Sequence, residues 1–426
     1  MNYVLKTLPN GLRVLVVPMR DRDSAGVAIW AKTGGRYETA KLSGASHYLE
    51  HMLFKGTKTR TTRQIKEEIE GVGGMLNAFT GEETTCYFAK LLSRHYPAAL
   101  EVLSDMVNNA TLTSVELEKE RTVILEEIKM YRDLPSQHVH DLINELLWPG
   151  QPMGRPIAGT EKSVKALTRT EIADYKKRYY HPRNLLVSVS GDVDPDEVLE
   201  KTAEHFSGKD HAGEKKFTPA VNRQNHPRTL FMEKTTEQTH FVIGFHGFSR
   251  FNPDRYKLGI LNVILGSNMS SRLFEEVREK RGLAYEIKSG LGFYADTGQV
   301  SISAGVETKK TPMAVRVILR ELEKICTTKV KAGELRRAKD YFMSQLVMAL
   351  EDTLDHLLWA GERVVDRGLL PDKPEIQRQI ESITEEDVQD VARRIFKTSS
   401  LNLALIGPVP QKMQNEIKKG FEIHGR

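Results

Sequence analysis

Apolar and polar residues alternate in the first seventeen residues, MNYVLKTLPNGLRVLVV, as two short apolar stretches around an Asn-Gly pair. Asn-Gly favours a tight turn, so this pattern predicts a strand, a turn and a second strand. GGMLNAFTGEETTCYFAKLL, at residues 73–92, repeats the design. It has a glycine turn, a strand with Leu76 and Phe79 on opposite sides, a second turn and another strand. The second hairpin therefore offers a candidate edge strand.

Two stretches have the spacing of amphipathic helices instead. The first lies within SGASHYLEHMLFKGT (43–57), bracketed by Gly44 and Gly56. Its apolar positions are Ala45, Leu49, Met52 and Leu53, with Leu42 just before the segment. The second is SVELEKERTVILEEIKMY (114–131), whose apolar side holds Leu117, Val123, Ile124, Ile128 and Tyr131. Ser114 is a candidate N-cap of this second helix.

The chain also contains an internal repeat. Residues 167–195 align with residues 383–411 without a gap, at an offset of 216. In both copies a Thr-led amphipathic helix runs into an apolar strand that ends at a glycine, Gly191 or Gly407. A gapless match of this length predicts two halves of one design.

Length and composition set the domain organisation. A chain of 426 residues is too long for one ordinary core. Residues 207–228 are rich in Gly, Lys, Pro and polar residues, which is typical of a linker. We therefore predict a first domain over 1–208, a linker over 209–228 and a second domain over 229–426.

Charge and hydropathy exclude some classes of function. The net charge of +5 is spread along the chain, so no basic stripe for nucleic acid is expected. No apolar run approaches 18 residues, so no membrane span is expected. The first residues have no basic segment followed by a long apolar core, so we expect no signal peptide. Two cysteines, Cys86 and Cys326, suit a reducing compartment. We expect a cytoplasmic protein.

The segment HYLEH carries the candidate chemistry. In a helix His47 and His51 share one face at i and i+4, and neutral imidazoles so placed can ligate one zinc ion. Glu50 lies beside them, where it could take a proton from a water. The alternative is chance, but an HxxEH arising by chance among 13 histidines has a probability of only a few per cent.

A third ligand is available on the helix at 114–131. Glu120 and Glu127 stand two helical turns apart and share a face, whereas Glu126 is rotated away from Glu127. Two carboxylates on one stripe suit a metal ligand and a partner that orients a ligand histidine. On spacing alone, charge on a solvated helix surface remains the simpler interpretation.

HYLEH followed by ERTVILEEI resembles the pitrilysin/insulinase family of zinc peptidases, and most of all its mitochondrial-processing-peptidase branch with its bacterial relatives. NGLRVLVVP, GRPIAGT, YHPRNLLVSVSGDVD and SSRLFEEVREKRGLAYEI extend the likeness over nearly the whole chain. The resemblance implies one Zn²⁺ per chain held by His47, His51 and Glu127. It also implies that Glu50 is the general base and that Glu120 is the acidic partner beside a ligand.

The resemblance assigns roles outside the metal site as well. Asn77, Ala78 and Phe79 would form an edge strand that pairs with the backbone of a peptide substrate, although by sequence alone the segment is an ordinary hairpin. Arg278 and Tyr285 match an Arg and a Tyr thought to hold the substrate carbonyl or its oxyanion. Without the resemblance, Arg278 would be a helix surface charge.

The implied fold is α+β, with two homologous α/β sandwich halves. Each half would be a mainly antiparallel sheet with helices on one side. The second half lacks the metal site, because HYLEH shifted by 216 falls on VILGS (263–267) and the counterpart of Glu127 is Gln345. Family members of this length work as two chains closed like a clamshell, which implies a homodimer or a pairing with a related inactive subunit.

The function expected from these observations is that of a zinc metalloendopeptidase acting on short or unfolded peptides. The alternative is a non-catalytic core or scaffold subunit of the same fold. Such subunits usually lose ligands or the base, and here all four residues of the motif set are present.

Overall fold

The computed structural model describes residues 2–207 and 216–423, and the chain forms two compact units. The first unit comprises Met1–Ile128, Pro156–Thr218 and Leu346–Lys373. The second comprises Lys129–Arg155, Pro219–Gln345 and Pro374–Arg426. The expected domains, 1–208 and 229–426, were continuous stretches, whereas each unit takes in a helical segment from the other half. Residues 209–215 of the predicted linker lie outside the described residues.

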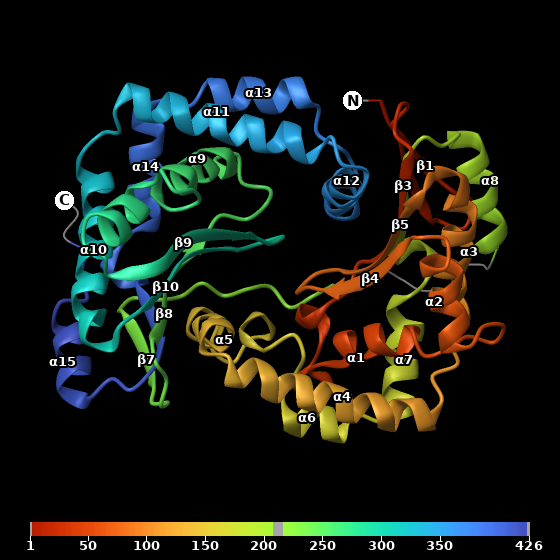
Figure 1. Ribbon diagram of the computed structural model, residues 1–426, viewed down its shortest axis with the longest axis horizontal. Helices are drawn as coiled ribbons and strands as arrows, with labels where there is room; N and C mark the ends of the chain where they lie inside the picture. Colours follow the sequence, from red (N-terminus) through yellow and green to blue (C-terminus); the bar gives the residue numbers. More distant parts are fainter. Residues whose placement is uncertain (1, 208–215, 424–426) are drawn as a thin grey trace. The chain divides into compact units, whose positions relative to one another are not determined.

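The first unit is built on a six-stranded sheet of order β1-β2-β6-β3-β5-β4 (Figure 1). Its strands are β1 (Val4–Thr7), β2 (Arg13–Pro18), β3 (Ser24–Ala31), β4 (Met75–Thr80), β5 (Thr85–Leu92) and β6 (Leu185–Gly191). β2 and β6 are parallel, and the other neighbours are antiparallel. Both predicted hairpins are present, as β1–β2 and β4–β5, and β4 is an edge strand as expected.

The second unit repeats this topology in a five-stranded sheet of order β7-β11-β8-β10-β9. Its strands are β7 (Arg228–Met232), β8 (Thr239–Gly247), β9 (Ala284–Phe293), β10 (Gly298–Val306) and β11 (Asn402–Ile406). β7 and β11 are its one parallel pair among the described strands, in the place that β2 and β6 take in the first sheet. The mainly antiparallel sheets confirm the predicted fold class.

The repeat detected in the sequence corresponds to equivalent elements in the two units. α7 (Arg169–Tyr179) leads into β6, and α14 (Glu385–Ile395) leads into β11. Thr168 and Thr384 begin these helices with the same capping box, in which each threonine hydroxyl accepts the backbone N–H of the third helical residue. The Thr-led helix is therefore a capping signal that the duplication preserved.

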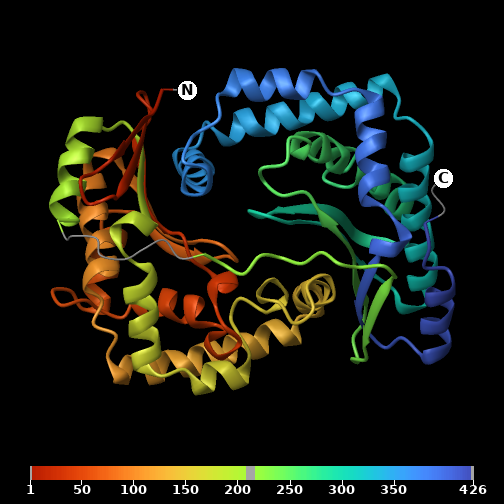
Figure 2. The same cartoon turned by 180° about the vertical axis from the view of Figure 1, so that it is seen from behind.

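The first sheet buries both of its faces. Val14 and Val16 of β2 join a core under α1 (Ala45–Leu53), α3 (Tyr96–Asn109), α7 and α8 (Pro195–His205). Leu15 and Val17 point the other way and pack with α12 (Thr353–Arg367). In both views α12 lies on the opposite side of the sheet from α3 and α8 (Figures 1 and 2). Helices were expected on one side only; β2 is apolar on both faces, so the second face also needs a cover.

In the second unit, α5 (Pro135–Leu147) covers the corresponding face. Its residues Val139, Ile143 and Leu147 pack against β8 and β11. A Cβ at Gly244 of β8 would lie 2.6 Å from Cγ1 of Ile143, so this close approach requires glycine. The other helices are α1 (Ala45–Leu53), α2 (Thr62–Glu70), α4 (Ser114–Asp133), α6 (Glu161–Ala166), α9 (Arg255–Leu265), α10 (Thr311–Thr327), α11 (Ala332–Ala349), α13 (Lys373–Glu381) and α15 (Gln411–Lys419).

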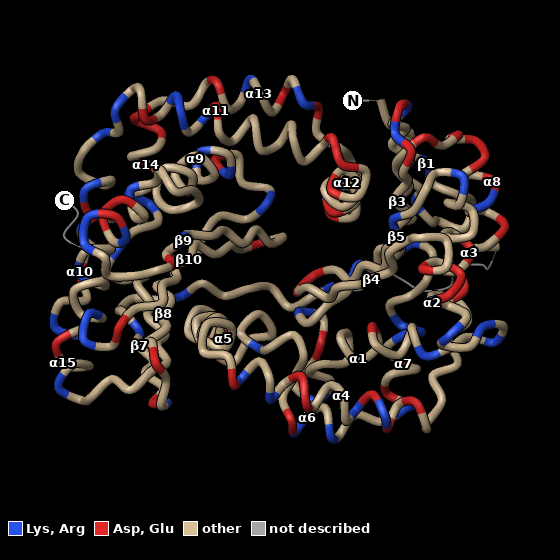
Figure 3. Tube along the Cα trace, viewed as in Figure 1, with Lys and Arg blue, Asp and Glu red and all other residues tan. Residues whose placement is uncertain are grey.

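Charge and hydropathy follow the sequence pattern. Basic and acidic residues are interspersed along the helices of each unit (Figure 3). Among the described residues, every helix is too short or too polar to cross a bilayer.

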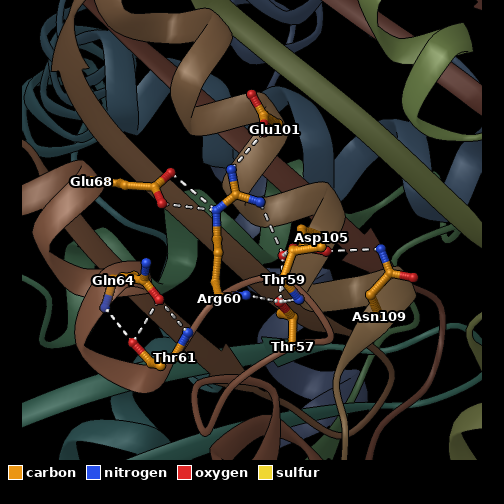
Figure 4. Close-up of polar contacts among 9 residues, drawn as sticks. All are labelled: Thr57, Thr59, Arg60, Thr61, Gln64, Glu68, Glu101, Asp105 and Asn109. Carbon is orange, nitrogen blue, oxygen red and sulfur yellow. Dashed lines mark hydrogen bonds and ion pairs between the residues drawn. The ribbon is translucent and has the colours of Figure 1, made fainter.

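The loop after α1 is fixed by a cluster of polar contacts centred on Arg60 (Figure 4). Its guanidinium donates to Glu68 of α2, and to Glu101 and Asp105 of α3, at 2.6–3.0 Å. Asp105 also accepts hydrogen bonds from Thr57, at 2.5 Å, and from Thr59. Arg60 and Asp105 are largely buried, and the cluster joins the loop that follows α1 to α2 and α3.

We expect Arg60→Met to lower the stability of the protein by about 2 kcal/mol, because it leaves the buried Asp105 carboxylate without its cation. Arg63→Met, which breaks the exposed Arg63–Glu67 pair, should change it by less than about 0.5 kcal/mol. The midpoint of urea unfolding measures both effects. Equal midpoints for the two variants would contradict a stabilising role for the cluster.

The same cluster should make stability fall in acid. Burial opposes the ionisation of Asp105, but hydrogen bonds from Thr57, Asn109, Arg60 and Thr59 outweigh it and lower the pKa of this carboxyl. A depressed folded-state pKa adds stability above the unfolded value, near 4, and that stability is lost as the pH falls through the folded pKa. The difference between wild type and Arg60→Met should therefore shrink below about pH 4.

Candidate metal centre

Helix α1 carries HYLEH and begins in an unusual way. Gly44, just before it, has φ of +93°, a conformation that suits glycine. No serine or threonine caps the helix; instead the buried Glu38 carboxylate accepts the backbone N–H groups of Gly44 and Ser46, at 2.7 and 2.6 Å. A carboxylate at the positive end of a helix both satisfies free N–H groups and stabilises the helix dipole. The predicted helix thus forms, with its cap supplied six residues upstream.

Helix α4 carries the candidate carboxylates and is tied to α1. Tyr48, between the two histidines in sequence, is fully buried, and its hydroxyl donates to the carbonyl of Leu117 at 2.5 Å. The N-cap of α4 is Thr113, whose hydroxyl accepts the N–H of Glu116, rather than Ser114. Ser114 is the first residue of the helix, so the predicted cap was one position late.

His47, His51 and Glu127 converge on one point. Glu127 Oε2 lies 3.7 Å from Nε2 of His47 and 3.5 Å from Nε2 of His51. One ligand atom from each of the three residues falls within 4.8 Å of the others. The structure thus places Glu127 beside the two histidines, and its role as a metal ligand stays a prediction.

The donor set fits zinc. Two imidazole nitrogens and one carboxylate oxygen are a common set for a zinc site that keeps a fourth position open. Bonds of about 2.0–2.1 Å in a tetrahedron put ligand atoms roughly 3.4 Å apart, close to the 3.7 and 3.5 Å between Oε2 of Glu127 and the two Nε2 atoms. Burial, with a smaller contribution from His51, lowers the pKa of His47 to about 3, so its imidazole is neutral and able to ligate at neutral pH.

Glu120 contacts His51 through Nδ1, the ring nitrogen other than the one nearest Glu127. Its Oε2 lies 3.1 Å from Nδ1 of His51, and its Oε1 accepts a hydrogen bond from Nζ of Lys55 at 2.7 Å. Burial opposes ionisation, but the bonds from His51 and Lys55 lower the pKa of Glu120. A carboxylate on Nδ1 fixes the tautomer that leaves Nε2 free to face a metal. This is the position that the resemblance gave to Glu120.

Glu50 lies on α1 between the two histidines and contacts the sheet. Its Oε2 accepts a hydrogen bond from the hydroxyl of Thr80, the last residue of β4, at 2.5 Å. Burial raises the pKa of Glu50, and the bond from Thr80 and the nearby His51 oppose that rise. A carboxylate whose pKa is raised toward neutrality is a better proton acceptor and donor at that pH than an exposed one.

Asn77, Ala78 and Phe79 lie on β4, whose outer edge faces no other strand of the described sheet. Residues along β4 alternate between exposed and half-buried. Asn77 is exposed, and its Oδ1 accepts the N–H of Ala78. Phe79 packs edge-on against Trp30 at 5.8 Å, between ring centroids, so its ring is held by the sheet. The outer edge of this strand therefore presents backbone hydrogen-bonding groups that no other described strand pairs with.

The second unit holds the remaining predicted residues. VILGS (263–267) lies mostly in α9, where Val263, Ile264 and Leu265 are buried, and Gln345 lies in α11. Arg278 lies on a π-helical turn, Phe274–Glu279. Its guanidinium carbon is 4.7 Å from the centre of the Phe274 ring and 5.0 Å from that of Tyr285, which is 79% exposed. The structure therefore brings Arg278 and Tyr285 together.

Three contacts of the site escaped sequence reasoning. Glu38 caps α1, Thr80 binds Glu50 and Lys55 binds Glu120. Glu38 reaches α1 from the loop just before it and Thr80 from the end of β4, and neither belongs to the helical pattern, so periodicity gives no signal for them. Lys55 stands four residues after His51, and only a three-dimensional view of Glu120 reveals its partner.

Comparison with known proteins finds relatives over most of the chain. Residues 13–161 match the family "Insulinase (Peptidase family M16)", and residues 166–342 match "Peptidase M16 inactive domain". An uncharacterized zinc protease of Streptomyces coelicolor is 36% identical, covering 96% of this chain and 91% of the relative. An uncharacterized zinc protease of Bacillus subtilis is 35% identical, covering 94% and 97%.

Solved structures show the same fold. A protease from Helicobacter pylori superposes with a TM-score of 0.90 at 25% identity, covering 95% of this chain and 99% of that one. A peptidase M16 inactive domain from Pseudomonas fluorescens gives 0.89 at 18% identity, covering 96% and 99%, which is a likeness of fold alone. The two family matches together cover more than half of the chain, and the two relatives share more than a third of their residues with nearly the whole chain. The chain therefore belongs to the insulinase family of zinc peptidases, peptidase family M16.

Proposed function

We propose that this protein is a zinc metalloendopeptidase that hydrolyses short or unfolded peptides. The observation that carries the proposal is the convergence of His47, His51 and Glu127, with Glu50 on the same helix. Three ligands leave one coordination position open, as catalytic zinc sites do, whereas structural zinc sites are usually closed by four ligands. The names of the relatives support the general class, and the substrate is inferred from the site.

The residues divide the chemistry among them. His47, His51 and Glu127 would hold the metal, and bound zinc supplies a Lewis acid that polarises a peptide carbonyl and acidifies water. Glu50 takes a proton from the attacking water and delivers it to the leaving amine. Glu120 orients the imidazole of His51 through Nδ1.

The free edge of β4 supports a preference for extended peptides. A peptide that adds to a sheet edge must have its own backbone hydrogen-bonding groups unpaired, which a folded domain rarely offers. Backbone pairing through Asn77, Ala78 and Phe79 is insensitive to side chains, so it admits many sequences. Thr80, at the end of the same strand, contacts Glu50, so this edge lies beside the proposed base.

We further propose a homodimer in which Arg278 and Tyr285 of one protomer would serve the metal centre of its partner. Hydrogen-bond donors there would stabilise the developing oxyanion of the substrate. The support is that the ligand set, the base and the Arg–Tyr pair all occur on one chain, so no role has been assigned to a different subunit. An active monomer in sedimentation at assay concentration would refute the dimer and leave the peptidase standing.

The test combines zinc analysis with cleavage of a quenched fluorogenic peptide library by the purified chain. We expect one zinc per chain, and cleavage that a chelator abolishes and added zinc restores. Zinc without cleavage of any peptide would favour the alternative, a non-catalytic core or scaffold subunit. Absence of zinc would refute the metal site.

A further inference from the structure

Thr80 connects two parts of the proposed site that are far apart in sequence. It is the last residue of β4, where it pairs with Thr85 of β5 across the hairpin. Its hydroxyl donates to Oε2 of Glu50, thirty residues earlier on α1, at 2.5 Å. The strand that offers a free edge to a peptide thus ends in a hydroxyl bound to the proposed base.

The contact uses one of the two carboxylate oxygens of Glu50. Among the described residues, Thr80 is the one hydrogen-bond donor to this carboxylate, and it binds Oε2. Hydrogen bonds to a charged acceptor are stronger than neutral ones, so this bond restricts the rotation of the side chain. The other oxygen, Oε1, can then accept a proton from a water. Because the hydrogen bond from Thr80 fixes Oε2, it also fixes the position of Oε1.

The strand itself is well fixed. Leu76 and Ala78 of β4 pack against the main core of the first unit, and six residues of β4 pair with β5. Thr80 therefore reaches Glu50 from a rigid element, which is what an orienting group requires. A hydroxyl on a mobile loop could not define the direction of a carboxylate equally well.

We propose that Thr80 is a positioning residue, which orients Glu50 for proton transfer through its hydroxyl and places the base in register with a peptide bound along β4. This inference rests on the proposed peptidase function. Thr80 does not touch the reacting atoms in this scheme. Thr80 affects the rate of the chemical step, because it positions Glu50. The free edge of β4 affects the binding of the peptide.

The test compares Thr80→Val, Thr80→Ser and Thr84→Val with wild type. Valine keeps the shape of threonine without its hydroxyl, serine keeps the hydroxyl, and Thr84 lies in the adjoining turn, with no side-chain hydrogen bond to the base. Misplacing a reacting group can cost about 100-fold, so we expect kcat of Thr80→Val to fall about 10- to 100-fold, with KM within about twofold of wild type. Thr80→Ser should recover most of kcat, and Thr84→Val should match wild type, with zinc content equal in all four proteins.

Several results would overturn the inference. An unchanged kcat in Thr80→Val would do so, and so would a raised KM at constant kcat, since that would place Thr80 in substrate docking. A loss that serine fails to restore would indicate a packing role. If wild type itself cleaves no peptide, the proposed function fails. Crystal structures of the variants then test the positioning role separately. The Glu50 side chain should leave its wild-type orientation in Thr80→Val and keep it in Thr80→Ser.

Discussion

Glu50→Gln is expected to keep one zinc per chain and to cleave peptides about 1,000-fold more slowly than wild type. Glutamine has nearly the same shape as glutamate, and Glu50 is not one of the three converging ligands, so the metal centre should survive. What is lost is a group that accepts a proton from water and returns it to the leaving amine. Single-turnover cleavage of a fluorogenic peptide and elemental analysis of the same preparations measure the two effects.

Glu70→Gln provides the matched control. Glu70 is exposed at the end of α2, outside the site, and its substitution makes the same change from carboxylate to amide. The Glu70→Gln variant should therefore cleave at the wild-type rate. If Glu50→Gln retains most of the wild-type rate, the base is another group. If it loses zinc as well as activity, the substitution has disturbed the metal centre and the role of the base must be tested at fixed zinc occupancy.

Glu127→Gln is expected to weaken zinc binding by more than about 100-fold. Even the loss of a residue that only hydrogen-bonds to a metal ligand lowers metal affinity by about 10- to 100-fold. A neutral amide is a poorer zinc ligand than a carboxylate, and the two histidines alone leave the site with too few donors. Competition with a chromogenic chelator measures the affinity directly, without any peptide. Activity should disappear in parallel at low zinc.

The neighbouring Glu126→Gln serves as the control for this variant. Glu126 is on the same helix and lies outside the converging group, so its affinity for zinc should equal that of wild type. The reverse result, with Glu126→Gln losing zinc and Glu127→Gln retaining it, would transfer the third ligand to Glu126. Equal affinity in all three proteins would show that zinc binds elsewhere.

Much of this fold could be predicted from the sequence, because its signals are local. The Asn-Gly hairpin, the apolar spacing around HYLEH and the Thr-led helix of each repeat are all carried by residues within a few positions of each other. The capping boxes at Thr168 and Thr384 each join a threonine to the third residue of the helix that it begins. This fixed spacing is the same in both copies, which is consistent with their alignment without a gap. The i, i+4 spacing of His47 and His51 is equally local.

Other features depend on which surfaces meet, and a single sequence does not state this. The apolar face of α12 is evident from its spacing, but nothing in that spacing names β2 and β3 as its partners. The two carboxylates Glu126 and Glu127 could be ranked only by resemblance, because the direction of α4 relative to α1 decides between them. Glu38 gave no signal at all, since its capping role exists only once the chain has folded back onto α1.

The discontinuity of the two units bears on the order in which the protein can fold during synthesis. The face of the first sheet that holds Leu15, Val17 and Trp30 is covered by α12, which ends at residue 367. Until that point has been translated, more than three hundred residues after β2, this apolar surface has no helix over it. A nascent chain in this state is prone to aggregate. The first half of the chain, expressed without α12, would therefore be a poor candidate for an independently folding domain.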